Sequence, residues 1–98
     1  MLFVRSVYGV HLFDTPGDRT FELCVSGYGR FISDAIASRS EDFIFLDIGA
    51  NLGLFSLLAA RNPHCRRVVA VEPLPEIFSN LRANIARNRA ENVRAVQG

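Results

Sequence analysis

The stretch Phe43-Ile44-Phe45-Leu46-Asp47-Ile48-Gly49-Ala50-Asn51-Leu52-Gly53 decides the fold of this chain. Its first four residues are apolar without polar alternation, which is typical of a parallel strand covered on both faces. A glycine-rich turn follows, and then Leu54, Leu57 and Leu58 at helical spacing, so the stretch predicts a strand, a tight loop and a helix. A helix that begins at such a loop presents backbone N–H groups and a partial positive charge to an anion.

The residues after this helix repeat the pattern. Asn62-Pro63 stops the helix, because proline disfavours helical geometry in the residue before it. A second apolar strand, a helix with an apolar stripe and a third strand are then predicted. They are Arg67–Val71, a helix from Pro75 with the stripe Phe78, Leu81 and Ile85, and Val93–Val96. Residues 43–98 are therefore predicted to form β-α-β-α-β, part of a Rossmann-like α/β sheet with three parallel strands and crossover helices.

The segment before residue 43 has a different character. Its β-branched and aromatic residues are broken by the turn formers Asp14–Asp18, which predicts a hairpin whose second strand covers residues 20–25. Four apolar residues at helical spacing then predict a short helix, and we expect most of them in the core: Phe31, Ile32, Ala35 and Ile36. Residues 1–42 are thus predicted to form a β-hairpin and a short helix.

Length and composition exclude several classes of protein. The chain has 98 residues, 49% of them hydrophobic, and a formal net charge of +1, so it has room for one domain. No apolar stretch reaches the roughly 20 residues of a membrane helix, so we expect a cytoplasmic protein that does not contact membranes. All 11 basic residues are arginines scattered along the sequence, which gives no reason to expect nucleic acid as a partner. The isolated histidines and cysteines predict no metal site.

Glu72 is the second residue that points to a ligand. It ends the second predicted strand, and in a doubly wound sheet an acidic residue there accepts hydrogen bonds from both hydroxyls of a ribose. Leu54 occupies the position where a dinucleotide fingerprint needs its third glycine, which disfavours an NAD-type oxidoreductase. Asn51 is predicted to cap a helix that starts near Leu52. The alternatives are a tight turn without a ligand and, for Glu72, a solvated surface carboxylate or a charge at the start of the helix ahead of Pro75.

Residues 46–56, with Asp47 ahead of glycines at Gly49 and Gly53, resemble the first motif of class I S-adenosylmethionine (SAM) methyltransferases, and more narrowly the FkbM-type family. The second block of that family is similar to Val71-Glu72-Pro73-Leu74-Pro75 followed by Phe78, Leu81, Asn84 and Asn88. The resemblance covers residues 43–98 and implies SAM as the cofactor. It places Asp47 near the ammonium group of the methionine part, the backbone of Gly49, Asn51 and Gly53 along the methionine and ribose, and Glu72 on the ribose hydroxyls.

The same resemblance implies O-methylation of a hydroxyl on a small molecule or sugar. The chain offers no general base for this step, and a complete fold of the class resembles a seven-stranded sheet. We therefore expect residues 1–98 to be a single truncated domain, the N-terminal, cofactor-binding half of a methyltransferase. Because an unpaired edge strand invites self-association, the alternative is an inactive fragment that acts as an interaction or oligomerisation module. Further candidates for cofactor or substrate contact precede the first parallel strand: Tyr28, Arg30 and Asp34.

Overall fold

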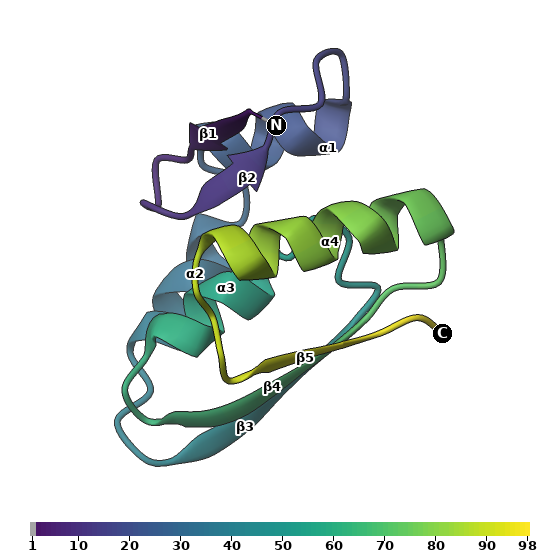
Figure 1. Ribbon diagram of the computed structural model, residues 1–98. Coiled ribbons are helices and arrows are strands. Elements are labelled where there is room, and N and C mark those ends of the chain that lie inside the picture. Colours follow the sequence, from purple (N-terminus) through teal and green to yellow (C-terminus); the bar gives the residue numbers. More distant parts are fainter. Residues whose placement is uncertain (1) are drawn as a thin grey trace.

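The computed structural model describes residues 2–98, which form three layers (Figure 1). A parallel three-stranded sheet has the order β3-β4-β5, and helices α3 and α4 lie together on one of its faces. The elements are β3 (Phe43–Ile48), α3 (Leu54–Arg61), β4 (Cys65–Val71), α4 (Pro75–Arg87) and β5 (Val93–Val96). The predicted β-α-β-α-β arrangement and its α/β fold class are confirmed.

The face of the sheet that α3 and α4 cover is closely packed. Val68 and Ala70 of β4 are 0% exposed, and so are Ala59 of α3 and Leu81 of α4. Phe45 of β3 also points to this side and packs beside Ala59 and Val68. Small residues in the strands and a leucine in the helix allow the two layers to approach closely, so burial of this face holds the helices on the sheet.

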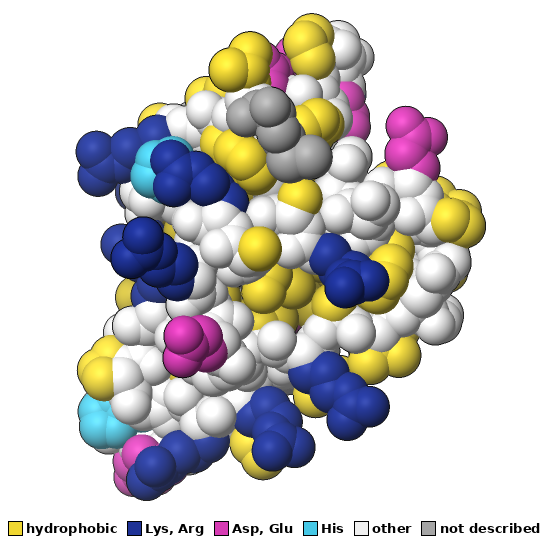
Figure 2. Space-filling model, viewed as in Figure 1, with side chains coloured by type: hydrophobic (Ala, Val, Ile, Leu, Met, Phe, Trp, Pro, Cys, Tyr) yellow, Lys and Arg dark blue, Asp and Glu magenta, His cyan; other side chains and the backbone are white. Residues whose placement is uncertain are grey.

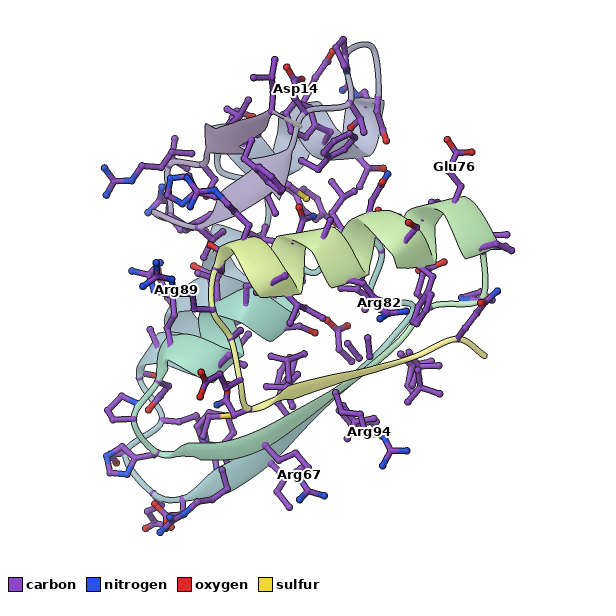
Figure 3. The ribbon with its side chains drawn as sticks, in the orientation of Figure 1. Asp14, Arg67, Glu76, Arg82, Arg89 and Arg94 are labelled. Carbon is purple, nitrogen blue, oxygen red and sulfur yellow. The ribbon has the colours of Figure 1, made fainter. Side chains whose placement is uncertain are left out.

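The opposite face of the sheet is bare within residues 2–98. Ile44, Leu46 and Ile48 of β3 are 69%, 63% and 70% exposed. Arg67 and Arg94 also project from this side, away from the two helices (Figure 3). The prediction that β3 is covered on both faces is therefore wrong for these residues, because both crossover helices lie on the same side of the sheet.

The N-terminal hairpin exists, but its turn does not lie where it was predicted. Strand β1 (Phe3–Arg5) pairs antiparallel with β2 (His11–Phe13), and the turn between them is closed by a hydrogen bond from Ser6 N to Val10 O of 2.8 Å. Leu12 of β2 is fully buried. The turn formers at residues 14–18 follow the hairpin instead of dividing it.

The predicted second strand over residues 20–25 is wrong, because this segment is helix α1 (Arg19–Ser26). Asp18 caps the helix: its carboxylate accepts hydrogen bonds from Thr20 N and Phe21 N. The sequence fits either period: Phe21, Leu23 and Val25 alternate as in a strand, whereas Phe21 and Cys24, which are both buried, have the spacing of one helix face. The N-cap decides between the two structures.

Helix α2 (Arg30–Ala37) confirms the predicted short helix but not its core. Ile36 is 6% exposed, whereas Phe31 is 88% and Ile32 is 45% exposed. Asn62, which follows α3 in extended backbone as the proline after it requires, holds the end of α2. Its buried amide donates to Ile36 O and Arg39 O at 3.0 and 3.1 Å.

Tyr8, in the turn of the hairpin, connects the hairpin to α1, α2 and α3. Its hydroxyl can donate to either of two carbonyl oxygens at the end of α1, Gly27 O at 2.8 Å or Tyr28 O at 2.9 Å. Arg61 of α3 donates to Tyr8 O at 2.9 Å, and the Arg30 guanidinium lies 5.2 Å from the centre of the Tyr8 ring. Arginines that are distant in sequence thus meet at the hairpin. Basic side chains also gather on the side of the molecule beside the hairpin, at the left in Figure 2.

Within residues 2–98, α4 is the longest helix at 13 residues, and none is long and apolar enough to span a membrane.

Candidate functional site

The glycine loop connects the end of β3 to the start of α3 through three left-handed residues. The φ angles are +73° at Gly49, +55° at Asn51 and +93° at Gly53. The loop lies against β4, because Gly49 N and Ala50 N both donate to Val71 O at 2.8 and 2.9 Å. This arrangement holds the loop at the carboxyl ends of two neighbouring parallel strands, where α/β proteins bind their ligands.

The two glycines of the loop are required for different reasons. A Cβ atom on Gly53 would lie 2.5 Å from Cδ1 of Leu81, so this glycine lets α4 approach the loop. A Cβ atom on Gly49 would have no heavy atom of residues 2–98 within 4 Å apart from its own chain neighbours, and the residue is exposed. Glycine is therefore required at position 49 only for the left-handed backbone conformation, and the open space beside it can admit a ligand.

Asn51 does not cap the helix as predicted. Helix α3 begins at Leu54, and its cap residue is Gly53, with no side-chain hydrogen bond to the first turn. Asn51 instead adopts a left-handed conformation, which asparagine tolerates better than most residues. Its backbone N–H donates to Glu72 Oε1 at 2.8 Å.

Glu72 lies beside the loop, as its position at the end of β4 predicted, but it is buried rather than solvated. Its side chain braces two backbone segments: Oε1 accepts from Asn51 N, and Oε2 accepts from Leu74 N at 3.1 Å. The residue is 4% exposed. A surface carboxylate is thus ruled out as the description of Glu72, and the ribose contact stays a prediction.

Asp47 is half-buried near the end of β3 and faces α3. Its Oδ2 accepts a hydrogen bond of 2.6 Å from the hydroxyl of Ser56, a fully buried residue in the first half of α3. Sequence reasoning missed Ser56, although a polar residue within an apolar helix face was a usable signal. The serine fixes the orientation of the carboxylate at the mouth of the loop.

The five predicted site residues therefore come together at one end of the sheet: Asp47, Gly49, Asn51, Gly53 and Glu72. Asn84 of α4 also contacts the glycine loop, although the sequence indicated it only as part of the second family motif. Its side-chain amide donates to Leu52 O of the loop at 2.8 Å.

Two of the additional candidates do not reach the loop. Arg30 and Asp34 line a cavity of about 430 Å³ together with Arg61 and Pro63 at the C-terminal end of α3, whereas the glycine loop lies at its N-terminal end. Tyr28 is nearer, with its ring 6.4 Å from that of Phe55 in the first turn of α3.

The remaining titratable groups form no metal-binding cluster among residues 2–98. Asp42 pairs with Arg66 at 2.6 Å and with His64 at 3.4 Å on the surface. The hydrogen bonds from Arg66 and His64 lower the pKa of the Asp42 carboxyl. Cys24 and Cys65 are free thiols, and burial raises the pKa of each.

The fold is shared with several solved structures, among them a methyltransferase. M. jannaschii TYW2, solved in complex with AdoMet, superposes with a TM-score of 0.74 at 21% identity over 93% of this chain and 40% of that chain. Trm5b from Pyrococcus abyssi gives 0.71 at 21% identity over 98% and 27%. The precorrin-6y C5,15-methyltransferase from Geobacter metallireducens gives 0.61 at 27% identity over 70% and 37%. The chain therefore has the fold of class I SAM-dependent methyltransferases.

Sequence similarity narrows this class. The chain is 39% identical over 59 residues to the 31-O-demethyl-FK506 methyltransferase FkbM from Streptomyces tacrolimicus, and 38% identical over 63 residues to the methyltransferase sdnD from Sordaria araneosa. It is 43% identical over 65 residues to the AMB antimetabolite synthetase AmbE from Pseudomonas aeruginosa. These matches confirm the predicted resemblance to FkbM-type methyltransferases. No protein-family model matches the sequence.

The matches cover 60–63% of this chain. The chain spans 22–24% of the length of FkbM and sdnD, and 3% of AmbE.

Proposed function

We propose that this chain binds SAM at its glycine loop and is the cofactor-binding part of a methyltransferase. The observation that carries this proposal is the convergence of Gly49, Gly53 and Glu72 at the carboxyl ends of β3 and β4, in the fold of SAM-dependent methyltransferases. Gly49 leaves open space on the exposed side of the loop, so the residues present fit a bound nucleoside.

Asp47 would attract the positive charges of the cofactor. Its Oδ2 holds the Ser56 hydroxyl, which fixes the plane of the carboxylate and lets Oδ1 face a cation. An ammonium group held near a half-buried carboxylate is stabilised more than in water, because the effective dielectric constant is lower.

Glu72 would act on the ribose while it also supports the loop. Each carboxylate oxygen has more than one acceptor site, so Oε1 and Oε2 can each accept a ribose hydroxyl beside the backbone N–H that they already accept. Both roles require the same side-chain position, and the buried environment keeps it in place.

The methyl acceptor is proposed to be a hydroxyl group of a small molecule. When bound, SAM supplies an electrophilic methyl group, and catalysis then depends chiefly on the position of the acceptor. The support is the similarity to FkbM, whose name describes methylation at a demethylated oxygen of FK506. Transfer of a labelled methyl group to hydroxyl compounds by the gene product that contains this chain would test this choice. Transfer to a nitrogen or carbon acceptor instead would contradict it.

Calorimetric titration of the protein with SAM tests the cofactor site. We expect Glu72→Ala to weaken binding by about tenfold or more, because charged hydrogen bonds to the ligand and to the loop are lost together. Glu76→Ala is the matched control, since Glu76 is an exposed carboxylate that points away from the sheet (Figure 3). Equal affinities of the wild type and Glu72→Ala would reject the proposed role of Glu72, and no binding by the wild type would reject the site.

A second candidate function is self-association, which the bare side of the sheet favours. Strand β3 is at one end of the sheet, and its Ile44, Leu46 and Ile48 are exposed. Antiparallel pairing of two β3 edges would join two such surfaces into one continuous sheet. Sedimentation equilibrium of the wild type and of Leu46→Arg tests this candidate. A dimer that Leu46→Arg abolishes would support it, whereas a wild type that stays monomeric at high concentration would exclude it.

A further inference from the structure

Two asparagines, Asn84 in α4 and Asn88 at its C-terminal cap, form hydrogen bonds with the outer edge of β2. His11 N donates to Asn88 Oδ1 at 2.8 Å, and Asn88 Nδ2 donates back to His11 O at 2.6 Å. Phe13 N donates to Asn84 Oδ1 at 2.6 Å. The asparagines are four residues apart and therefore share one helix face, while residues 11 and 13 share one strand edge. The side-chain amides take the place of a neighbouring strand.

Asn84 differs from Asn88 in the contact that its side-chain Nδ2 makes. Its Nδ2 donates to Leu52 O of the glycine loop at 2.8 Å, and the side chain is 0% exposed. A single buried amide thus joins the hairpin, α4 and the loop. Asparagine suits this position because it accepts with one atom and donates with the other. Aspartate would lose the donor, and leucine would lose both.

The loop is held at three consecutive residues. Asn51 is fixed through its N–H to Glu72, and Gly53 packs under Leu81. Leu52 lies between them, 2% exposed, and its carbonyl is bound by Asn84. Since Asn51 is in a left-handed conformation that costs free energy, the flanking contacts must hold it there.

We propose that Asn84 is a positioning residue of the cofactor site, whose side-chain amide sets the order of residues 51–53. This inference rests on the proposed SAM-binding function. Asn84 does not touch the proposed ligand; it fixes the carbonyl of Leu52 and thereby the two residues on either side. Loss of this contact frees the loop, and the ligand must then order it on binding, which weakens affinity.

Asn84→Ala and Asn88→Ala form a matched pair for the test. Each substitution removes one side-chain amide and leaves backbone groups without their side-chain partner. These are Phe13 N and Leu52 O for Asn84, and His11 N, His11 O and Asn84 O for Asn88. Both variants loosen the hairpin, but only Asn84→Ala releases the loop.

Amide hydrogen exchange without ligand is the first measurement. We expect exchange at residues 51–53 to rise by about tenfold or more in Asn84→Ala, relative to an amide in the centre of β4, and to change little in Asn88→Ala. Titration with S-adenosylhomocysteine is the second: we expect the Kd to rise about tenfold in Asn84→Ala and less than about twofold in Asn88→Ala.

Equal loop exchange in the two variants, or an unchanged Kd in Asn84→Ala, would overturn the inference. If Asn84→Ala does not fold, Asn84→Ser replaces it with the same expected rise in loop exchange, because the shorter side chain cannot contact both Phe13 N and Leu52 O while water can hydrate the freed groups. If the wild type does not bind S-adenosylhomocysteine, the proposed function fails, whereas the exchange contrast still decides whether Asn84 orders the loop.

Discussion

The two faces of the three-stranded sheet are built from similar residues but have opposite surroundings. Under α3 and α4, Val68 and Ala70 are 0% exposed, whereas Leu46 and Ile48 on the other face are 63% and 70% exposed. Burial in this chain is therefore decided by where the helices lie and not by the hydropathy of the strands. An apolar residue on the first face contributes to stability, and one on the second face is available to a partner.

Substitution of one leucine on each side of the sheet tests the contrast between the two faces most directly. Leu81→Ala on the covered side should lower the free energy of unfolding by about 2–5 kcal/mol, because it leaves a cavity in a closed core. Leu46→Ala on the bare face should cost less than about 1 kcal/mol, since little of its side chain is buried. Urea denaturation of both variants measures the difference. Similar losses would show that the bare face is covered in solution.

The meeting point of the covered face and the glycine loop provides the next test. Gly53→Ala should destabilise the protein by about 3 kcal/mol, because alanine is strained at a φ of +93° and its Cβ atom would approach Leu81 Cδ1. In the background of Leu81→Ala that clash disappears, and the cost should fall to about 1–2 kcal/mol, the backbone part alone. A cost that is the same in both backgrounds would refute the steric explanation.

A smaller effect is expected in the N-terminal layer, away from both faces. Burial, with a contribution from the negative charge of Asp18, raises the pKa of the Cys24 thiol from 9.0 to about 11. Above pH 9 the unfolded chain loses this proton while the folded chain keeps it. Stability is therefore fully present below the unfolded pKa and is lost as pH rises toward 11, by roughly 2 kcal/mol.

Denaturation between about pH 8 and about pH 10.5 measures this loss. Cys24→Ala should show a shallower decline than the wild type, since it lacks the titrating group. Parallel declines would assign the pH dependence to other groups, among them Cys65, whose pKa burial also raises.

The smallest effect is expected at the exposed pair of Asp42 and Arg66. Hydrogen bonds from Arg66 and His64 lower the pKa of Asp42, so its contribution is present above pH 3.8 and is lost as pH falls below that value. Because both partners are exposed to water and salt, Asp42→Asn should leave the denaturation midpoint at neutral pH unchanged within error. A clear shift would indicate that this corner is covered in solution.

The sequence was sufficient to predict the parallel sheet and its crossover helices. In that part of the chain, the spacing of the apolar residues and the glycine, asparagine and proline residues that end each element indicate the same structure. The sequence was not sufficient for residues 19–26, where Phe21, Leu23 and Val25 suit a strand and Phe21, Cys24 and Val25 suit a helix. The hydrogen bonds from Thr20 N and Phe21 N to the Asp18 carboxylate favour the helix over the strand. From the sequence alone, a turn-forming aspartate cannot be identified as a helix N-cap.

The position of the site residues was also predictable, but their contacts were not. Glu72 was expected at the ribose, and its bond to Asn51 N depends on a left-handed loop residue that the sequence pattern does not specify. Asn84 lies 32 residues from its partner Leu52 and 71 residues from its partner Phe13. No local pattern can reveal a contact of that separation.

The anchorage of Tyr8 also gives the molecule an optical signal. The chain has two tyrosines and no tryptophan, so its intrinsic fluorescence comes from Tyr8 and Tyr28 alone. The Tyr8 hydroxyl faces two carbonyl oxygens and its ring lies under the Arg30 guanidinium, surroundings that quench phenol emission. Release of the hairpin removes this quenching. A rise in tyrosine emission would therefore report release of the hairpin from the end of α1 without any added label.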